Sequence, residues 1–249
     1  MSIAQTCGNI PTAEAEERFY AMLGEQKQAA WLIRSSLRHT RGDSLVWRDI
    51  CRATDERTVI ASFIPMAGAD FTLRVNIGQC DTAHFVPGLV ANLNAIPLDY
   101  VSWQQSGGTH LADFVSKQLP VSPPAFYTRS RLASVVPRVL ELTYTSHALA
   151  PCARDLGHQG PPFRWDEDRR AYLRADLDAF YARAYDLSRD ELRFILDPAD
   201  VRGPDHPSKT FHVLKEKEIR QYGEYRTARL VLAAWDCMDA DGSFRSLGL

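Results

Sequence analysis

Residues 47 to 65 bring charged side chains of both signs directly before an apolar run. Six charges fall within ten positions there: Arg48, Asp49, Arg52, Asp55, Glu56 and Arg57. From residue 31 to residue 75 the arginines exceed the acids by two, and the same excess of basic residues recurs from 102 to 145. From 165 to 200 the acids exceed the arginines by four. The first two stretches could face phosphate, and we expect the acidic stretch to face water or another protein.

No motif in the sequence has the spacing of a known catalytic or metal site. The string Ser106-Gly107-Gly108-Thr109 lacks the lysine and the spacing of a phosphate-binding loop. The seven histidines are scattered, and the five cysteines form no CxxC pair. The net charge of −2 also argues against a general nucleic-acid binder. We therefore predict no catalytic residue and no metal ligand in this chain, and we expect its cysteines to be reduced.

Periodicity and composition predict the elements of the first half. We expect a helix over 12–38, strands over 44–53 and 58–65, and a third strand over 71–77. The short polar connection at 54–57 makes the first two strands a hairpin or a bulged ribbon. Helical spacing continues over 86–105, where Pro97 must kink or interrupt the helix. Thr109 can cap a short helix over 110–118.

The second half is predicted to be mainly helical. Helices are expected over 131–149, 166–186, 188–197 and 224–240, and Ser188 with Glu191 has the spacing of a capping box. We therefore predict an α+β fold, with a mixed α/β module over 1–125 and a helical module over 126–249. No apolar run approaches the roughly 18 residues needed to cross a bilayer. The N-terminus lacks the pattern of a signal peptide, so we expect a cytoplasmic protein without a membrane partner.

The segment WRDICRATDERTVIASFIP resembles part of the C-terminal target-recognition region of large adenine-specific DNA methyltransferases. These include Type IIG restriction–modification enzymes and related phage-defence methylases. Further motifs of that family follow in the same order, and the resemblance spans residues 30 to 240. They include LN and DY at 93–94 and 99–100, GGTHL at 107–111, KQLPV at 117–121, ELTYT at 141–145, PPFRWDE at 161–167, LSRDELR at 187–193 and YGEYRT at 222–227.

The resemblance implies a DNA target-recognition part that binds double-stranded DNA and positions a methyltransferase domain. That domain would flip adenine out of the stack and methylate it. Family members carry it upstream, with S-adenosylmethionine and Asn-Pro-Pro-Tyr motifs that are absent here. The chain looks like the recognition part alone, as a split-gene subunit, a truncated gene or an expressed fragment. We expect no cofactor in this chain, S-adenosylmethionine in the partner methyltransferase domain or subunit, and no methyl transfer by the chain alone.

The resemblance gives two interpretations of the charged segment. Its arginines could anchor phosphate and read guanine, with the acids accepting from cytosine. The interpretation that we favour is that these charges pair with one another and tie the turn to a neighbouring helix, because enzymes with different target sites share the motif. Base-reading residues would then lie in 66–86 or 122–131. The candidate DNA-binding residues are Arg48, Arg52, Arg57, Lys117, Arg129 and Arg131, the last three as phosphate contacts.

A second function stays open beside DNA recognition. The chain could be a protein-interaction module, or a non-functional remnant of such an enzyme without DNA affinity. In the leading hypothesis the helical module packs against the methyltransferase partner, and its acidic face stays away from DNA.

Overall fold

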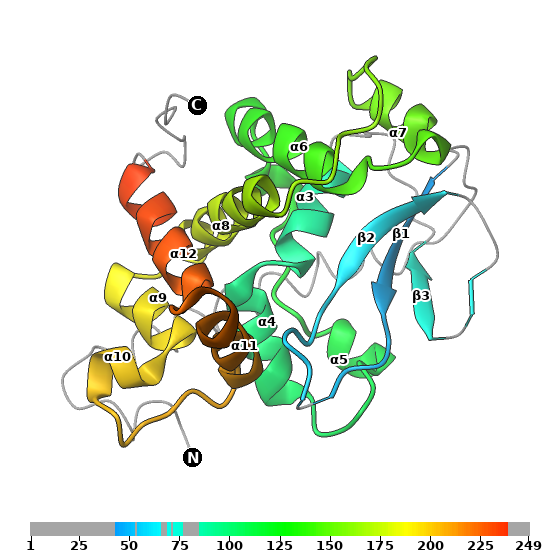
Figure 1. Cartoon of the computed structure of the whole chain (residues 1–249). Coiled ribbons are helices and arrows are strands. Elements are labelled where there is room, and N and C mark those ends of the chain that lie inside the picture. The colour runs from blue at the N-terminus through cyan, green and yellow to red at the C-terminus, as the bar shows by residue number, and fades with distance from the viewer. Residues whose placement is uncertain (1–42, 53, 66–68, 71, 77–84, 239–249) are drawn as a thin grey trace.

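The structure is a computed structural model that describes residues 43–52, 54–65, 69–70, 72–76 and 85–238 (Figure 1). The helix predicted over 12–38 lies outside the described residues. In the described part, one small sheet is accompanied mostly by helices, so the predicted α+β class is confirmed.

The sheet has three antiparallel strands in the order β2-β1-β3. They are β1 (Asp43–Arg48), β2 (Ala61–Pro65) and β3 (Leu73–Asn76). Leu45 of β1 pairs with Phe63 of β2, and both side chains are buried. The predicted pairing of the first two strands is confirmed, but both strands are shorter than predicted. Beyond the hydrogen bond from Arg48 N to Ile60 O, β1 and β2 separate. Helices and loops elsewhere in the chain take backbone groups of described residues in the connection between them. Ile50, for example, bridges to His110.

Two helices follow where one interrupted helix was predicted. They are α3 (Phe85–Leu93) and α4 (Ile96–Gln105), and Pro97 lies in the first turn of α4. A proline is tolerated there because the first backbone N–H groups of a helix need no intrahelical acceptor. The helix predicted over 110–118 is wrong at its start, since only α5 (Asp113–Ser116) is helical. Thr109 is not a cap, because its carbonyl accepts from Cys51 N in a loop that pairs with the sheet.

The rest of the described chain is helical, as predicted. Short 3-10 turns, η2 (Pro124–Phe126) and η3 (His147–Leu149), flank α6 (Arg129–Thr143), which ends six residues before the predicted boundary. The other helices are α7 (Ala150–Asp155), α8 (Glu167–Ala184), α9 (Arg189–Leu196), α10 (Pro198–Arg202), α11 (His212–Tyr222) and α12 (Arg226–Cys237). The capping box of Ser188 and Glu191 is confirmed at the start of α9. Helices α10 and α11 were not predicted.

Helix α8 lies at the centre of the packing. It contacts α3, α4, α6 and α12, and Figure 1 places it between the sheet and the C-terminal helices. Tyr181 of α8 is fully buried, as are Ile96 of α4 and Val231 of α12. The division near residue 125 remains a prediction, but one hydrophobic core runs across that position. No helix in the described residues is both long and apolar enough to cross a membrane.

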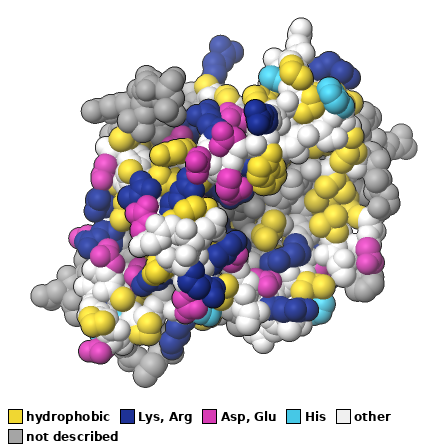
Figure 2. Space-filling model, in the orientation of Figure 1, with side chains coloured by type: hydrophobic (Ala, Val, Ile, Leu, Met, Phe, Trp, Pro, Cys, Tyr) yellow, Lys and Arg dark blue, Asp and Glu magenta, His cyan; other side chains and the backbone are white. Residues whose placement is uncertain are grey.

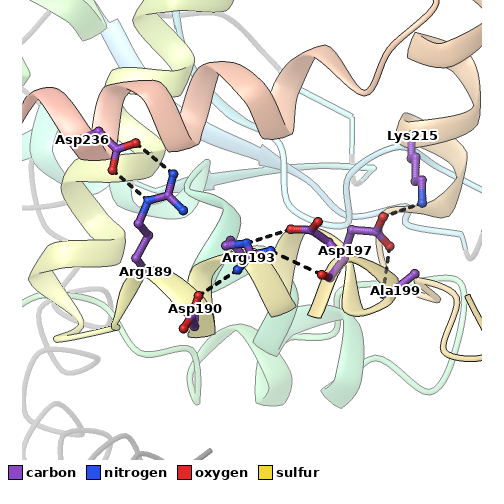
Figure 3. A network of polar contacts seen from close by, with 8 residues as sticks. Arg189, Asp190, Arg193, Asp197, Ala199, Lys215 and Asp236 are labelled. Atoms are coloured by element: carbon purple, nitrogen blue, oxygen red, sulfur yellow. Dashed lines mark hydrogen bonds and ion pairs between the residues drawn. The ribbon is translucent and has the colours of Figure 1, made fainter. Parts of the chain in front are cut away.

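Ion pairs join the helices of the acidic C-terminal part (Figure 3). Arg189 of α9 donates from two nitrogens to Asp236 of α12, at 2.8 and 2.9 Å. Arg193 binds Asp190 within α9 and Asp200 of α10. Such partly exposed pairs stabilise a fold only slightly. They place each of these three acids beside an arginine, so none of them is an isolated negative charge.

Candidate functional site

The charged segment is anchored by a buried ion pair between Arg57 and Asp99. Arg57 Nε donates to Asp99 Oδ2 at 2.8 Å, and the other carboxylate oxygen accepts from the backbone N–H groups of Thr58 and Val59 at 3.0 and 2.7 Å. Asp99 has no exposed surface. Burial lowers the pKa of Arg57, but the charges of Asp99 and Asp178 outweigh it and raise that pKa above its usual value. The turn is thus tied to helix α4.

Asn94 reinforces the same junction. Its side chain accepts from Ala61 N at 3.1 Å and donates to Ala61 O at 2.9 Å, which occupies both backbone groups of the first residue of β2. The Asn94 carbonyl also accepts from Arg57 Nη2. A fully satisfied network of this kind fixes one geometry, because any broken contact would leave a buried polar group without a partner.

The other two arginines of the segment differ from each other. Arg48 Nη2 lies 3.0 Å from Asp55 Oδ2 and donates to the carbonyl of Arg57 at 2.8 Å. The side chain of Arg52 is exposed, and only its backbone bonds to Asp55. Its N–H donates to the Asp55 carboxylate, and its carbonyl accepts from Asp55 N. The structure therefore brings Arg48 and Arg57 together in internal contacts, as the favoured interpretation predicts. Arg52 remains accessible.

A second buried carboxylate, Asp49, holds the end of β1. Its Oδ1 accepts from Arg74 Nε of β3 at 2.9 Å, and its Oδ2 lies 2.6 Å from His110 Nδ1. Burial raises the pKa of Asp49, but the hydrogen bonds from His110 and Arg74 outweigh it, so the pKa is lowered. Neither partner was assigned a role from the sequence. The available signal was the position of His110 inside the GGTHL motif.

The remaining three candidates lie in two places, one directly after α5 and two in the first turn of α6. Lys117 follows α5 and is half-buried, whereas Arg129, the first residue of α6, is exposed. The Arg131 guanidinium lies 4.1 Å from the centroid of the Phe126 ring and donates to the Phe126 carbonyl at 2.9 Å. Among the described residues, no recorded contact joins these three to Arg48, Arg52 or Arg57.

A cleft of about 700 Å³ opens between β2, α3, α6, α8, α11 and α12. The cations in its described lining are Arg57, Arg170, Arg174, Lys217 and Arg226, and the acids are Glu56, Glu167, Asp178 and Glu218. Apolar side chains also line it, with Val59, Val90, Val139 and Leu142 among them. Figure 2 shows charged side chains of both signs crowded over the helical half of this face, with hydrophobic side chains more frequent over the sheet half.

Asp178 forms the inner end of the cleft. The residue is only 4% exposed, and its Oδ1 accepts from Ile96 N, at the start of α4, at 2.7 Å. No hydrogen bond from the described residues reaches its other oxygen. Burial is the largest cause that raises the pKa of Asp178 to about 6, although the charge of Arg57 opposes it. A carboxyl group with one free oxygen in a cavity can accept a hydrogen bond from a ligand.

Two arginines of α8 lie nearer the mouth. Arg170 stacks on Trp165, with its Cζ 3.7 Å from the centroid of the indole, and donates to the Leu142 carbonyl at 2.9 Å. Its Nε is buried without a partner among the described residues. Burial lowers the pKa of Arg170, and the positive charge of Arg174, one turn away, lowers it further. Like charges at this spacing repel each other, so a bound anion would relieve the repulsion.

The lining residues of α8 were missed because the sequence assigned its acids to a solvent-facing surface. They fall at positions 167, 170, 171, 174, 175, 177 and 178, which share one face of a helix. The available signal was Asp178 itself, an acid enclosed by Leu177 and Ala179 on the apolar side of the pattern. No group of three or more His, Cys, Asp or Glu that could hold a metal occurs in the described part of the chain.

The comparisons with known proteins identify no relative. No protein-family model matches the chain, and no curated protein or solved structure is similar enough to it to count as a match.

Proposed function

We propose that the chain is the DNA target-recognition part of an adenine-specific DNA methyltransferase or restriction–modification system. It binds duplex DNA and positions a separate methyltransferase domain, which supplies S-adenosylmethionine. The cations that meet DNA differ in part from those predicted. Arg48 and Arg57 hold the fold together, whereas Arg52, Lys117 and Arg129 remain as phosphate contacts.

The placement of the resemblance motifs supports this proposal. Arg57 belongs to the first motif, and Asn94 and Asp99 belong to the LN and DY pair, yet these three residues contact one another in the core. Enzymes with different target sites would share the residues that hold the fold together. The residues that read the DNA sequence would vary between these enzymes.

The observation that carries the proposal is the start of α6. This helix of 15 residues begins with Arg129 and Arg131 and has no acid in its first turn. Helices α8 and α9 place two acids in that turn, which is the arrangement that complements the helix dipole. Helix α12 also lacks an acid there, but Arg226 at its start pairs with Asp168, whereas Arg129 at the start of α6 is exposed. The Thr128 side chain caps the N–H of Arg131, and a helix start beside an exposed arginine suits a phosphate group. The start of α6 therefore has positive side chains where acids are usually favoured, and a bound DNA phosphate could supply the missing negative charge.

The alternative, a protein-interaction module or remnant without DNA affinity, is favoured by one observation. Two of the three arginines in residues 48–57 form internal ion pairs, so few cations of this segment can contact phosphate. Binding to DNA decides between the two.

The test is binding of the full chain to a pool of random duplex DNA across a salt series. We expect enrichment of one short sequence and a steep loss of affinity with salt. Arg129→Ala should weaken binding to all sequences and reduce the salt slope by about one. Lys209→Ala is the control, because Lys209 is exposed outside the α6 region. Absence of binding at low salt, or equal effects of both variants, would overturn the proposal.

A further inference from the structure

We propose that the cleft beside α8 binds a single nucleotide unit, with an amino-bearing base against Asp178 and its phosphate at Arg170 and Arg174. The binding of a nucleotide in the cleft is argued from the geometry of the cleft alone. That this nucleotide is a base extruded from DNA rests on the proposed function.

The inner end of the cleft requires a hydrogen-bond donor. Asp178 is buried over more than nine-tenths of its surface and lines the cavity, and the described residues satisfy only one of its oxygens. A carboxylate only accepts hydrogen bonds, so the ligand must bring N–H groups. The exocyclic amino groups of adenine, cytosine and guanine provide them. Thymine has no amino group. Its single N3–H donor lies between two carbonyl oxygens, and these would be brought close to the carboxylate and repel it.

The outer end of the cleft requires an anion. Arg170 has a buried Nε without a described partner, and Arg174 brings a second positive charge one turn further along. Arg174 is half exposed, and its distance to Glu167 is 3.5 Å, so that pair competes weakly with a phosphate. Arginine is well suited to phosphate because its planar fork donates two parallel hydrogen bonds.

The spacing along α8 relates the two ends. Arg174 and Arg170 precede Asp178 by four and eight residues, which places them about 6 and 12 Å from it along the helix axis. All three side chains belong to the face that lines the cleft. A nucleotide, with an amino group at one end and a phosphate at the other, therefore meets both requirements at once.

The walls and the size of the cleft fit the flat faces of a base. Val59 and Val90 line one part, and Val139 and Leu142 line another. A volume of about 700 Å³ lies in the range of small-molecule sites and is too small for a DNA duplex. One unstacked nucleotide is the part of DNA that can enter it, as in enzymes that extrude a base from the duplex.

The experiment measures calorimetric binding of dAMP, dCMP, dGMP, dTMP and inorganic phosphate to the full chain. We expect the three amino-bearing nucleotides to bind about tenfold or more tightly than dTMP, as one hydrogen bond to a charged group predicts. Asp178→Asn should remove that preference, and Asp176→Asn should not, because Asp176 pairs with Arg138 outside the cleft. Ala171→Trp fills the cleft and should abolish binding, whereas the same change at the exposed Ala233 should have no effect.

The outcomes separate this inference from the proposed function. If duplex DNA binds but no mononucleotide does, or if neither cleft variant alters nucleotide binding, the cleft proposal is wrong and the proposed function stands. If nucleotides bind through Asp178 but duplex DNA does not bind, the cleft proposal stands without the proposed function. Duplexes with one unpaired adenine should bind more tightly than matched duplexes if the base comes from DNA, and equally if the ligand is a free nucleotide.

Discussion

Asp49, at the end of β1, and Asp178, at the inner end of the cleft, are both almost completely buried, yet their pKa values move in opposite directions. Burial raises the pKa of both carboxyl groups. Asp49 receives hydrogen bonds from Arg74 and His110, which reverse the effect. Asp178 receives one bond from a neutral backbone N–H, and the charge of Arg57 only reduces the effect.

The number of filled acceptor positions, and not the direction of the pKa shift alone, separates carboxylates that hold the fold from one that is left for a ligand. Burial raises the pKa of Asp99 as well, but Arg57 and two backbone N–H groups fill its acceptor positions, so it belongs with Asp49. A buried charge with its hydrogen bonds satisfied contributes to a unique geometry, whereas one left half-satisfied costs stability and therefore points to a functional role.

The largest expected effect is the loss of stability in Asp99→Ala. Removing this carboxylate leaves the Arg57 charge and two buried N–H groups without their partner, so the free energy of unfolding should fall by about 3–5 kcal/mol. Denaturant unfolding measures it. Asp200→Ala, which breaks the exposed pair with Arg193, is the control and should cost less than about 1 kcal/mol. Similar losses of unfolding free energy in both variants would show that the buried pair stabilises the fold no more than the exposed pair does.

Asp178→Asn should increase the free energy of unfolding, in contrast to Asp99→Ala, and the increase should depend on pH. A raised pKa means that the folded state holds its proton while the unfolded state has lost it, so wild-type stability falls as pH rises from about 4 through about 6. The change from 3.8 to about 6 corresponds to about 3 kcal/mol. The variant should therefore become more stable than wild type at pH 7.5 and lose that advantage near pH 4. Parallel stability curves would contradict the assignment.

The smallest change in stability is expected for Asp49→Asn. This variant should be less stable than wild type at neutral pH, whereas Asp178→Asn should be more stable. The lowered pKa of Asp49 stabilises the fold above the unfolded value and ceases to do so as pH falls through the folded value. The variant should lose about 1 kcal/mol at neutral pH, because Arg74 and His110 are partly exposed. The deficit should vanish in acid. Unfolding curves measured in steps from pH 7 into acid test this, and a deficit that does not change with pH would show a purely steric cause.

Local signals predicted local structure. The capping box at Ser188, the break at Pro97 and the alternation of the strands each depend on residues within a few positions, and these expectations were confirmed. Helix α10 was missed although Asp197 caps it and Pro198 opens it, which is a recognisable start signal. Helix α11 ends at Gly223, whose positive φ of 76° is the usual helix stop, and this signal was also overlooked.

Long-range contacts could not be predicted from spacing. Arg57 meets Asp99 over 42 positions, and Asp178 meets Ile96 over 82. The error at the start of the helix predicted over 110–118 has the same origin, because His110 contacts Ile50 and Asp49 instead. The interpretation that charges in 48–57 lock a turn to a helix was sound. Which of them remain available for DNA depends on partners that only the fold reveals.

The central position of α8 has a consequence for synthesis on the ribosome. Tyr181 donates to the Gly88 carbonyl, Tyr185 donates to the Pro120 carbonyl, and Asp178 accepts from Ile96 N. Domains generally fold as units from the N-terminus as the chain emerges. The described residues before 125 complete their interior only after α8 has left the exit tunnel, so we expect the nascent chain to expose apolar surface for that interval. Folding of the first half is thereby coupled to synthesis of the second.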